Sequence, residues 1–79
     1  MAFNVYKVNP LPDYTGHSLV AASNPDEANQ IITDYIKSKD VTEVIDAYGY
    51  GHVDKSDKVD GMTYPDKGFV HHGIKWKGL

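Results

Sequence analysis

Residues 23–37 read SNPDEANQIITDYIK, and this stretch carries the local signals that start an amphipathic helix. Asn24 is the expected N-cap, and Pro25 occupies the first helical position, where its missing N–H costs nothing. Glu27 lies three residues after the cap, where it can complete a capping box. Two acidic residues in this first turn also suit the positive end of the helix dipole. The sequence therefore predicts a helix over about residues 25–38.

Apolar and polar residues occupy opposite sides of this predicted helix. The apolar positions recur at i, i+3, i+4, i+7 and i+8 and are Ala28, Ile31, Ile32, Tyr35 and Ile36. The polar side is formed by Asn29, Gln30, Thr33, Asp34 and Lys37. A single apolar stripe of this width is typical of a helix that covers one face of a second layer.

The residues before the helix predict two strands joined by a loop. Residues 3–8 alternate with a period of two, which places Phe3 and Val5 on one face. Two prolines and a glycine then interrupt the pattern over residues 9–16, because proline lacks a backbone donor and glycine tolerates turns. Residues 17–22 resume an extended pattern, so the two strands are expected to pair as a hairpin.

The residues after the helix predict two further strands. Residues 41–50 are rich in β-branched and aromatic side chains and form the expected third strand, with a possible extension to Val53. The charged residues that follow, up to residue 63, are expected to be a loop, and residues 65–68 a turn. Residues 69–77 alternate as a fourth strand. One face of that strand should carry Phe69, His71, Gly73 and Lys75, and the other Val70, His72, Ile74 and Trp76.

The order of elements is then ββαββ, that is, a hairpin, a helix and a second hairpin. It predicts one small α+β domain over residues 1–79, in which a four-stranded antiparallel sheet carries one helix on one face. A chain of this size buries only roughly 60–65% of its unfolded surface. It has no cysteine for a disulfide or a thiolate zinc site. Because oligomerisation is a common remedy for a thin core, a homodimer is expected.

The charge balance disfavours nucleic acid as a partner. The chain has 8 Lys, no Arg and 11 acidic residues, and its net charge is -3. Nucleic-acid binders usually carry a basic face and use arginine to contact bases. No apolar run approaches the roughly 18 residues of a membrane span, and the first residues lack the basic-then-apolar order of a signal peptide. We therefore expect a cytoplasmic protein that binds neither nucleic acid nor membranes.

The sequence has more aromatic side chains than a single helix can bury against the sheet. Depending on register, the uncovered sheet face is expected to hold Tyr6, Tyr48, Tyr50, Phe69 or Trp76, and an exposed aromatic face is a candidate contact surface. The predicted binding surface consists of Tyr48, Tyr50, His52, Phe69, His71, Lys75 and Trp76. The chain resembles no family in its motifs, and the leading hypothesis is a small interaction module of the adaptor or inhibitor type, such as phages and mobile elements encode.

Enzymatic chemistry has little support, and no cofactor is expected. The sequence has no cysteine nucleophile, no glycine-rich phosphate loop and no serine in an elbow motif. The alternative function is a small-molecule or nucleotide binder with a pocket or dimer cleft formed by Tyr48, Tyr50, His52, His71 and Lys75.

A metal site is not expected from the sequence either. Neighbouring residues of a strand point to opposite faces, so His71 and His72 cannot both bind one ion. One of them could still join His52 and Asp54 across the predicted hairpin.

Overall fold

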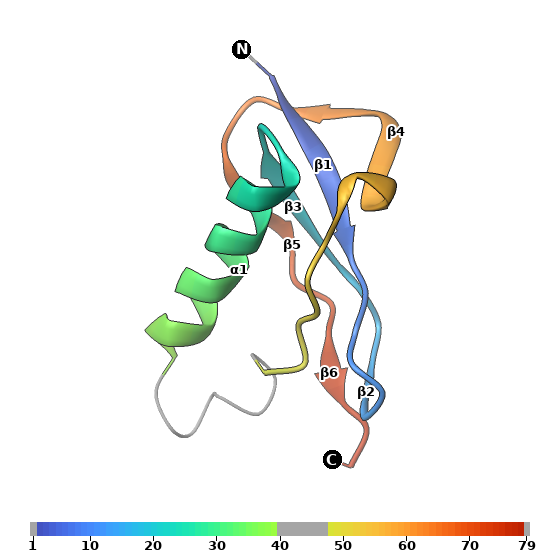
Figure 1. Cartoon of the computed structure of the whole chain (residues 1–79). Coiled ribbons are helices and arrows are strands. Elements are labelled where there is room, and N and C mark those ends of the chain that lie inside the picture. Colours follow the sequence, from blue (N-terminus) through green and yellow to red (C-terminus); the bar gives the residue numbers. More distant parts are fainter. Residues whose placement is uncertain (1, 40–47, 79) are drawn as a thin grey trace.

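The computed structural model describes residues 2–39 and 48–78 of the chain (Figure 1). Its elements in chain order are β1 (Phe3–Val8), β2 (Tyr14–Thr15), β3 (Ser18–Ala22), α1 (Pro25–Ser38), the short 3-10 helix η1 (Lys55–Asp57), β4 (Lys58–Tyr64), β5 (Gly68–His71) and β6 (Lys75–Trp76). Four strands form an antiparallel sheet in the order β4-β1-β3-β5, and β2 pairs with β6 in a separate two-stranded ribbon. Because α1 packs on this sheet, the predicted α+β class and ββαββ order are confirmed.

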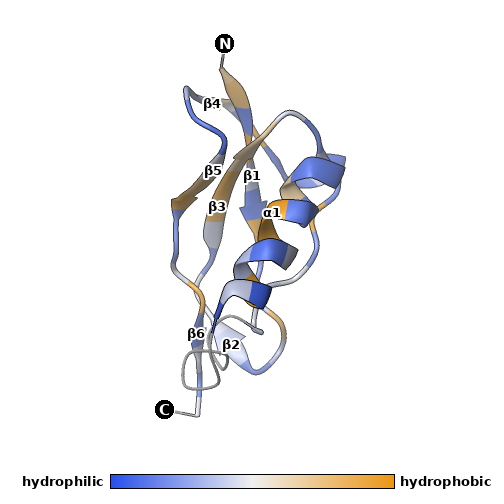
Figure 2. Ribbon diagram, turned by 90° about the vertical axis from the view of Figure 1, so that its left-hand side faces the viewer, coloured by the Kyte–Doolittle hydropathy of each residue, from blue (hydrophilic) through white to orange (hydrophobic). Residues whose placement is uncertain are grey.

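The centre of the sheet is the hairpin of β1 and β3, which matches the two strands expected before the helix. Its register runs from the pair Asn4–Ala22 to the pair Val8–Ser18. Direct partners in an antiparallel pair lie on the same face. Tyr6 and its partner Val20 belong to the hydrophobic core that α1 shares. Figure 2 shows α1 beside one face of the sheet only.

Helix α1 begins and ends where the sequence predicts. The Asn24 side chain accepts a hydrogen bond from the Glu27 N–H over 2.8 Å, as an N-cap should. The Glu27 carboxylate accepts in return from the Ser23 N–H over 2.8 Å, one residue earlier than in a regular capping box. Within the described residues, no helix has the length and apolar character needed to cross a membrane.

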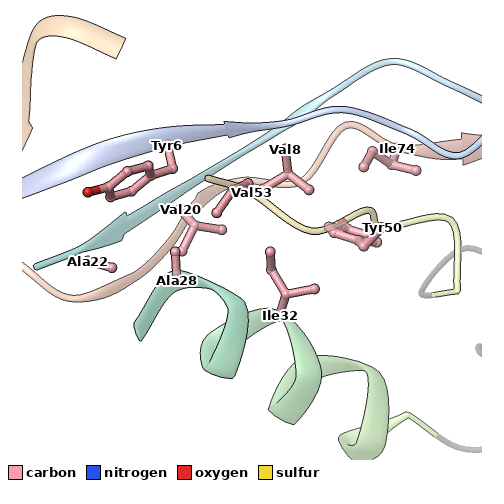
Figure 3. Packing of buried hydrophobic residues seen from close by; sticks show 9 residues of the cluster. All are labelled: Tyr6, Val8, Val20, Ala22, Ala28, Ile32, Tyr50, Val53 and Ile74. Atoms are coloured by element: carbon pink, nitrogen blue, oxygen red, sulfur yellow. The ribbon is translucent and has the colours of Figure 1, made fainter. Parts of the chain in front are cut away.

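The hydrophobic core lies between α1 and the sheet. Figure 3 shows Ala28 and Ile32 directed from α1 towards the strands. The buried cluster consists of Tyr6, Val8, Val20, Ala22, Ala28, Ile32, Tyr50, Val53 and Ile74. The other residues of the predicted stripe, Ile31, Tyr35 and Ile36, are partly buried against it, so the stripe is confirmed.

Strand β4 corrects the prediction that the charged residues before residue 64 form a loop. It pairs with β1 through Phe3–Tyr64 and Asn4–Thr63, and again through Tyr6–Lys58 after a shift of register. Residues 59–62 of β4 therefore lie opposite the single residue Val5 of β1, and Gly61 with a φ of +75° lies in this irregular part. The strand is mostly exposed and lies at a sheet edge, where charge and bulges are tolerated, so its sequence lacks the alternation of a half-buried strand.

The two strands of the four-stranded sheet that follow the helix do not form a hairpin with each other. Strands β4 and β5 follow each other in the chain but lie at opposite edges of the sheet, so they do not pair. Residues 65–67 link them across the end of β1 and β3, and the predicted turn lies in this link (Figure 1). Of the predicted third strand, residues 41–47 lie outside the described residues. Its remaining residues are not a strand, although Tyr50 forms an isolated bridge with Pro10.

The predicted fourth strand divides into β5 and β6, and a bulge changes which side chains share a face. Leu19 pairs with His71, but its neighbour Val20 pairs with Phe69, so Val70 has no direct partner. Because of this shift, Phe69 and His71 point to opposite faces instead of the same one. The bulge is specified by pairing with β3, so the sequence of residues 69–77 alone could not indicate it.

Candidate interaction surface

The sheet face opposite α1 is largely apolar. We call it the open face and define it by direct cross-strand partners on β1, β3, β4 and β5 and by the alternation of their side chains. Its members are Phe3, Val5, Lys7, Leu19, Ala21, Tyr64 and His71. Five of these seven residues are hydrophobic, although α1 lies on the other side of the sheet (Figure 2).

The sequence of β3 explains this character. It reads SLVAA, with no charged residue on either side. An antiparallel strand with one solvated face normally alternates apolar and polar side chains, whereas a run without alternation is typical of strands covered on both faces. Strand β3 therefore has the composition of a strand with a layer on each side, while α1 supplies only one of them.

The exposed apolar atoms of the open face lie towards β4. At the centre, the paired residues Val5 and Ala21 are completely buried. Tyr64 is 39% exposed, and Met62, two positions earlier in β4, is 41% exposed. The solvent-accessible hydrophobic side chains of this face are thus carried by an edge strand.

The seven residues of the predicted binding surface do not form one surface. Of these residues, only His71 lies on the open face. Tyr50 is 7% exposed and belongs to the core on the α1 side, where Phe69 also packs. Tyr6 is a buried member of the same core. The aromatic side chains expected on the uncovered face are therefore mainly core residues.

The other predicted residues lie at the end of the molecule formed by β2 and β6 or in the segment that leads to η1. Trp76 of β6 packs edge-to-face on Tyr14 of β2 with ring centroids 5.0 Å apart. Tyr48, His52 and Lys75 are exposed. No pocket is found on the part of the chain that the structure describes.

Tyr50 and Phe69 take part in a cluster of rings that joins α1 to β5. His72 stacks on Phe69 with centroids 4.2 Å apart and lies 4.8 Å from the ring of Tyr35 in α1. Its Nδ1 is 3.1 Å from the Tyr50 hydroxyl, which also accepts a hydrogen bond from Ser18 Oγ over 3.2 Å. Partial burial lowers the pKa of His72, and the nearby charges of Lys39 and His71 act in the same direction.

The contacts of this ring cluster hold α1, β3 and β5 together. Ser18 is completely buried and also accepts from the Gly73 N–H over 3.0 Å, so one hydroxyl connects β3 to the segments that contain Tyr50 and Gly73. Among the described residues, no buried side-chain polar atom lacks a hydrogen-bond partner. The arrangement fixes the end of α1 against the sheet and encloses no ligand site.

The structure separates His71 and His72 as their alternation predicts, with His71 on the open face and His72 on the α1 side. The described residues contain no group of three or more histidine or acidic side chains arranged around a metal position, so the set with His52 and Asp54 is not assembled. The sequence interpretation missed a different neighbour: the rings of His17 and His71 lie 6.1 Å apart. Only the register of β3 with β5, which a single sequence does not reveal, would have indicated this pair.

Comparisons of the chain with protein-family models, with curated proteins and with solved structures return no match.

Proposed function

We propose that the protein is a small, cytoplasmic, non-enzymatic interaction module that binds a protein partner through the open face. The observation that supports this proposal most directly is the composition of β3, which has no charged residue on either side while α1 covers one side. A partner that covers the open face would give β3 the second layer that its sequence suits.

A second copy of the chain is the partner we favour. A domain of 79 residues has a thin core, and self-association is a common way for small domains to gain buried apolar area. The exposed Met62 and Tyr64 side chains would supply that area along β4. Full burial of a large apolar side chain is worth about 1.5–3 kcal/mol, so covering their exposed parts contributes about 1 kcal/mol each.

The experiment is sedimentation equilibrium of the purified protein over a wide concentration range, in the presence of a chelator. We expect the wild type to form a dimer, and the Tyr64→Ser variant to dissociate with a dissociation constant raised about thirtyfold, which corresponds to about 2 kcal/mol because the substitution removes about 1 kcal/mol from each of the two protomers. Circular dichroism and thermal melting of the variant monitor its fold separately from its association.

The chain offers matched controls away from the open face. Leu11 is 44% exposed and Tyr48 is 57% exposed, and neither lies on the four-stranded sheet. Leu11→Ser and Tyr48→Ser should leave the dimer constant unchanged, since they remove similar exposed apolar area elsewhere. A wild type that stays monomeric at every concentration, or controls that weaken the dimer as much as Tyr64→Ser does, would contradict self-association through this face.

A further inference from the structure

The rings of two histidines from separate segments of the chain lie close together at the β5 side of the sheet. His17 immediately precedes β3, and His71 is the last residue of β5, where it pairs with Leu19. Their ring centroids are 6.1 Å apart and the ring planes are inclined by 55°. Both residues are exposed, so water and ions reach the space around the rings.

The backbone that carries these two rings is held in place. The buried hydroxyl of Ser18, next to His17, accepts a hydrogen bond from the N–H of Gly73, two residues after His71. A Cβ atom on Gly73 would lie 2.2 Å from the carbonyl oxygen of His17 and 2.9 Å from Nε2 of His71. Glycine at this position therefore permits the close approach of the two chain segments that carry His17 and His71.

The separation of the rings fits one shared ion. A metal–nitrogen bond to histidine is about 2.0–2.1 Å long, and a ring nitrogen lies about 1.2 Å from its centroid, so two imidazoles on one ion have centroids about 5.2 Å apart at a tetrahedral angle and at most about 6.4 Å apart. The observed 6.1 Å lies within that limit. A change of side-chain rotamer that brings the two rings about 1 Å closer together would give the tetrahedral distance. Exposed histidines make such changes readily.

The ring nitrogens of this pair are also uncommitted in the part of the chain that the structure describes. No described residue forms a hydrogen bond or ion pair with the ring of His17 or of His71. Each imidazole can therefore present a lone pair without breaking an existing interaction. By contrast, His72 has its Nδ1 beside the Tyr50 hydroxyl.

We propose that His17 and His71 form a binding site for one divalent transition-metal ion per chain. Imidazole ligands select zinc, nickel and copper over magnesium and calcium, which prefer oxygen ligands. Two protein ligands leave the remaining coordination positions to water. The site lies at the β5 edge of the open face, whereas the proposed contact with a second copy is carried by Met62 and Tyr64 at the β4 edge, so ion binding does not require that contact.

The test is a zinc titration of the full chain followed by calorimetry and by the nitrogen resonances of the histidine rings. We expect one Zn²⁺ per chain, a rise in melting temperature because the ion binds only the folded state, and simultaneous shifts of the His17 and His71 resonances. Magnesium at the same concentration should have no effect.

The controls use the other histidines and the matched substitution to glutamine. His17→Gln and His71→Gln should each abolish the rise in melting temperature, whereas His52→Gln, which removes an exposed histidine outside the pair, should leave it unchanged. Zinc binding that survives both His17→Gln and His71→Gln would overturn the proposal. A stoichiometry of one ion per two chains would also overturn it, because the ion would then bridge copies. Sedimentation in chelator keeps this outcome separate from that of the proposed function.

Discussion

The side chain of Asn29 connects α1 to the backbone of Val53. Its side-chain amide donates to the carbonyl oxygen of Val53 over 2.9 Å, and its Oδ1 accepts from the N–H of Val53 over 2.8 Å. One side chain thus satisfies both backbone groups of a residue that is itself part of the core. In the sequence Asn29 belongs to the polar side of the helix, and nothing near it indicates a partner 24 positions later.

Replacement of Asn29 should therefore cost more than its polar character suggests. Asn29→Ala leaves the N–H and C=O of Val53 without their partner in a partly buried place, so the free energy of unfolding should fall by about 1–3 kcal/mol. Urea denaturation followed by circular dichroism measures this loss. Gln30→Ala, which removes an exposed bond to Asp34 within the helix, should change stability by less than about 0.5 kcal/mol. Equal effects of the two substitutions would argue against the role of Asn29.

Glu27 makes the start of α1 sensitive to acid. The Glu27 carboxylate accepts a hydrogen bond from the Ser23 N–H, and this bond lowers the pKa of Glu27 below the ordinary 4.5. The nearby charge of Lys67 lowers the pKa further. A lowered pKa means that the folded state prefers the ionised form. Its contribution to stability is therefore fully present above pH 4.5 and is lost as the pH falls through the lower folded-state value.

A comparison of the wild type with Glu27→Gln over a series of pH values tests this linkage. The wild type should melt at the higher temperature near neutral pH, and the difference should shrink towards zero in acid, where both side chains are uncharged. Thermal melts at constant ionic strength give the measurement. A difference that persists undiminished in strong acid would mean that the Glu27 charge is not its cause.

At the scale of the element, β4 depends on a glycine that its irregular path requires. Gly61 has a φ of +75°, and a Cβ atom there would meet nothing within 4 Å. A substitution therefore tests backbone conformation without a steric clash. Gly61→Ala should lower the free energy of unfolding by about 1–2 kcal/mol, the usual cost of the left-handed region for an L-residue. Gly61→Asn should cost less, because asparagine visits that region more readily.

Denaturant titrations of the wild type and of these two variants measure the differences in the free energy of unfolding. If alanine and asparagine prove equally tolerated, the positive φ of Gly61 carries no energetic weight and the irregular register of β4 has another origin.

The elements differ in how far the sequence could predict them, and the reason is the range of their determinants. The bounds of α1 follow from a cap, a proline and an apolar stripe that all lie within residues 23–37. Strand β4 has no such local code, because it is exposed and, among the described strands, pairs only with β1. The bulge at Val70 depends on β3, which is distant in the chain.

At the scale of the whole molecule, the layers could be predicted but not the strand order. One apolar stripe implies one helix on one sheet, whereas the position of each strand depends on pairings between distant residues. The surface prediction depended on that order. It assigned Tyr50 and Phe69 to the uncovered side, whereas both side chains pack in the core on the α1 side, and it did not consider His17 beside His71.

The link over residues 65–67 places two consecutive strands at the two outer edges of the sheet. In the central hairpin, Val8 pairs with Ser18, only 10 positions later, whereas at the β4 edge Phe3 pairs with Tyr64, 61 positions later. Each doubling of a closed loop costs about 0.6 kcal/mol of chain entropy, so the outer pairings carry a penalty of about 1–2 kcal/mol that the hairpin does not. The sheet is therefore expected to assemble from its centre outwards, and its two borders are the last part to close and the first to open.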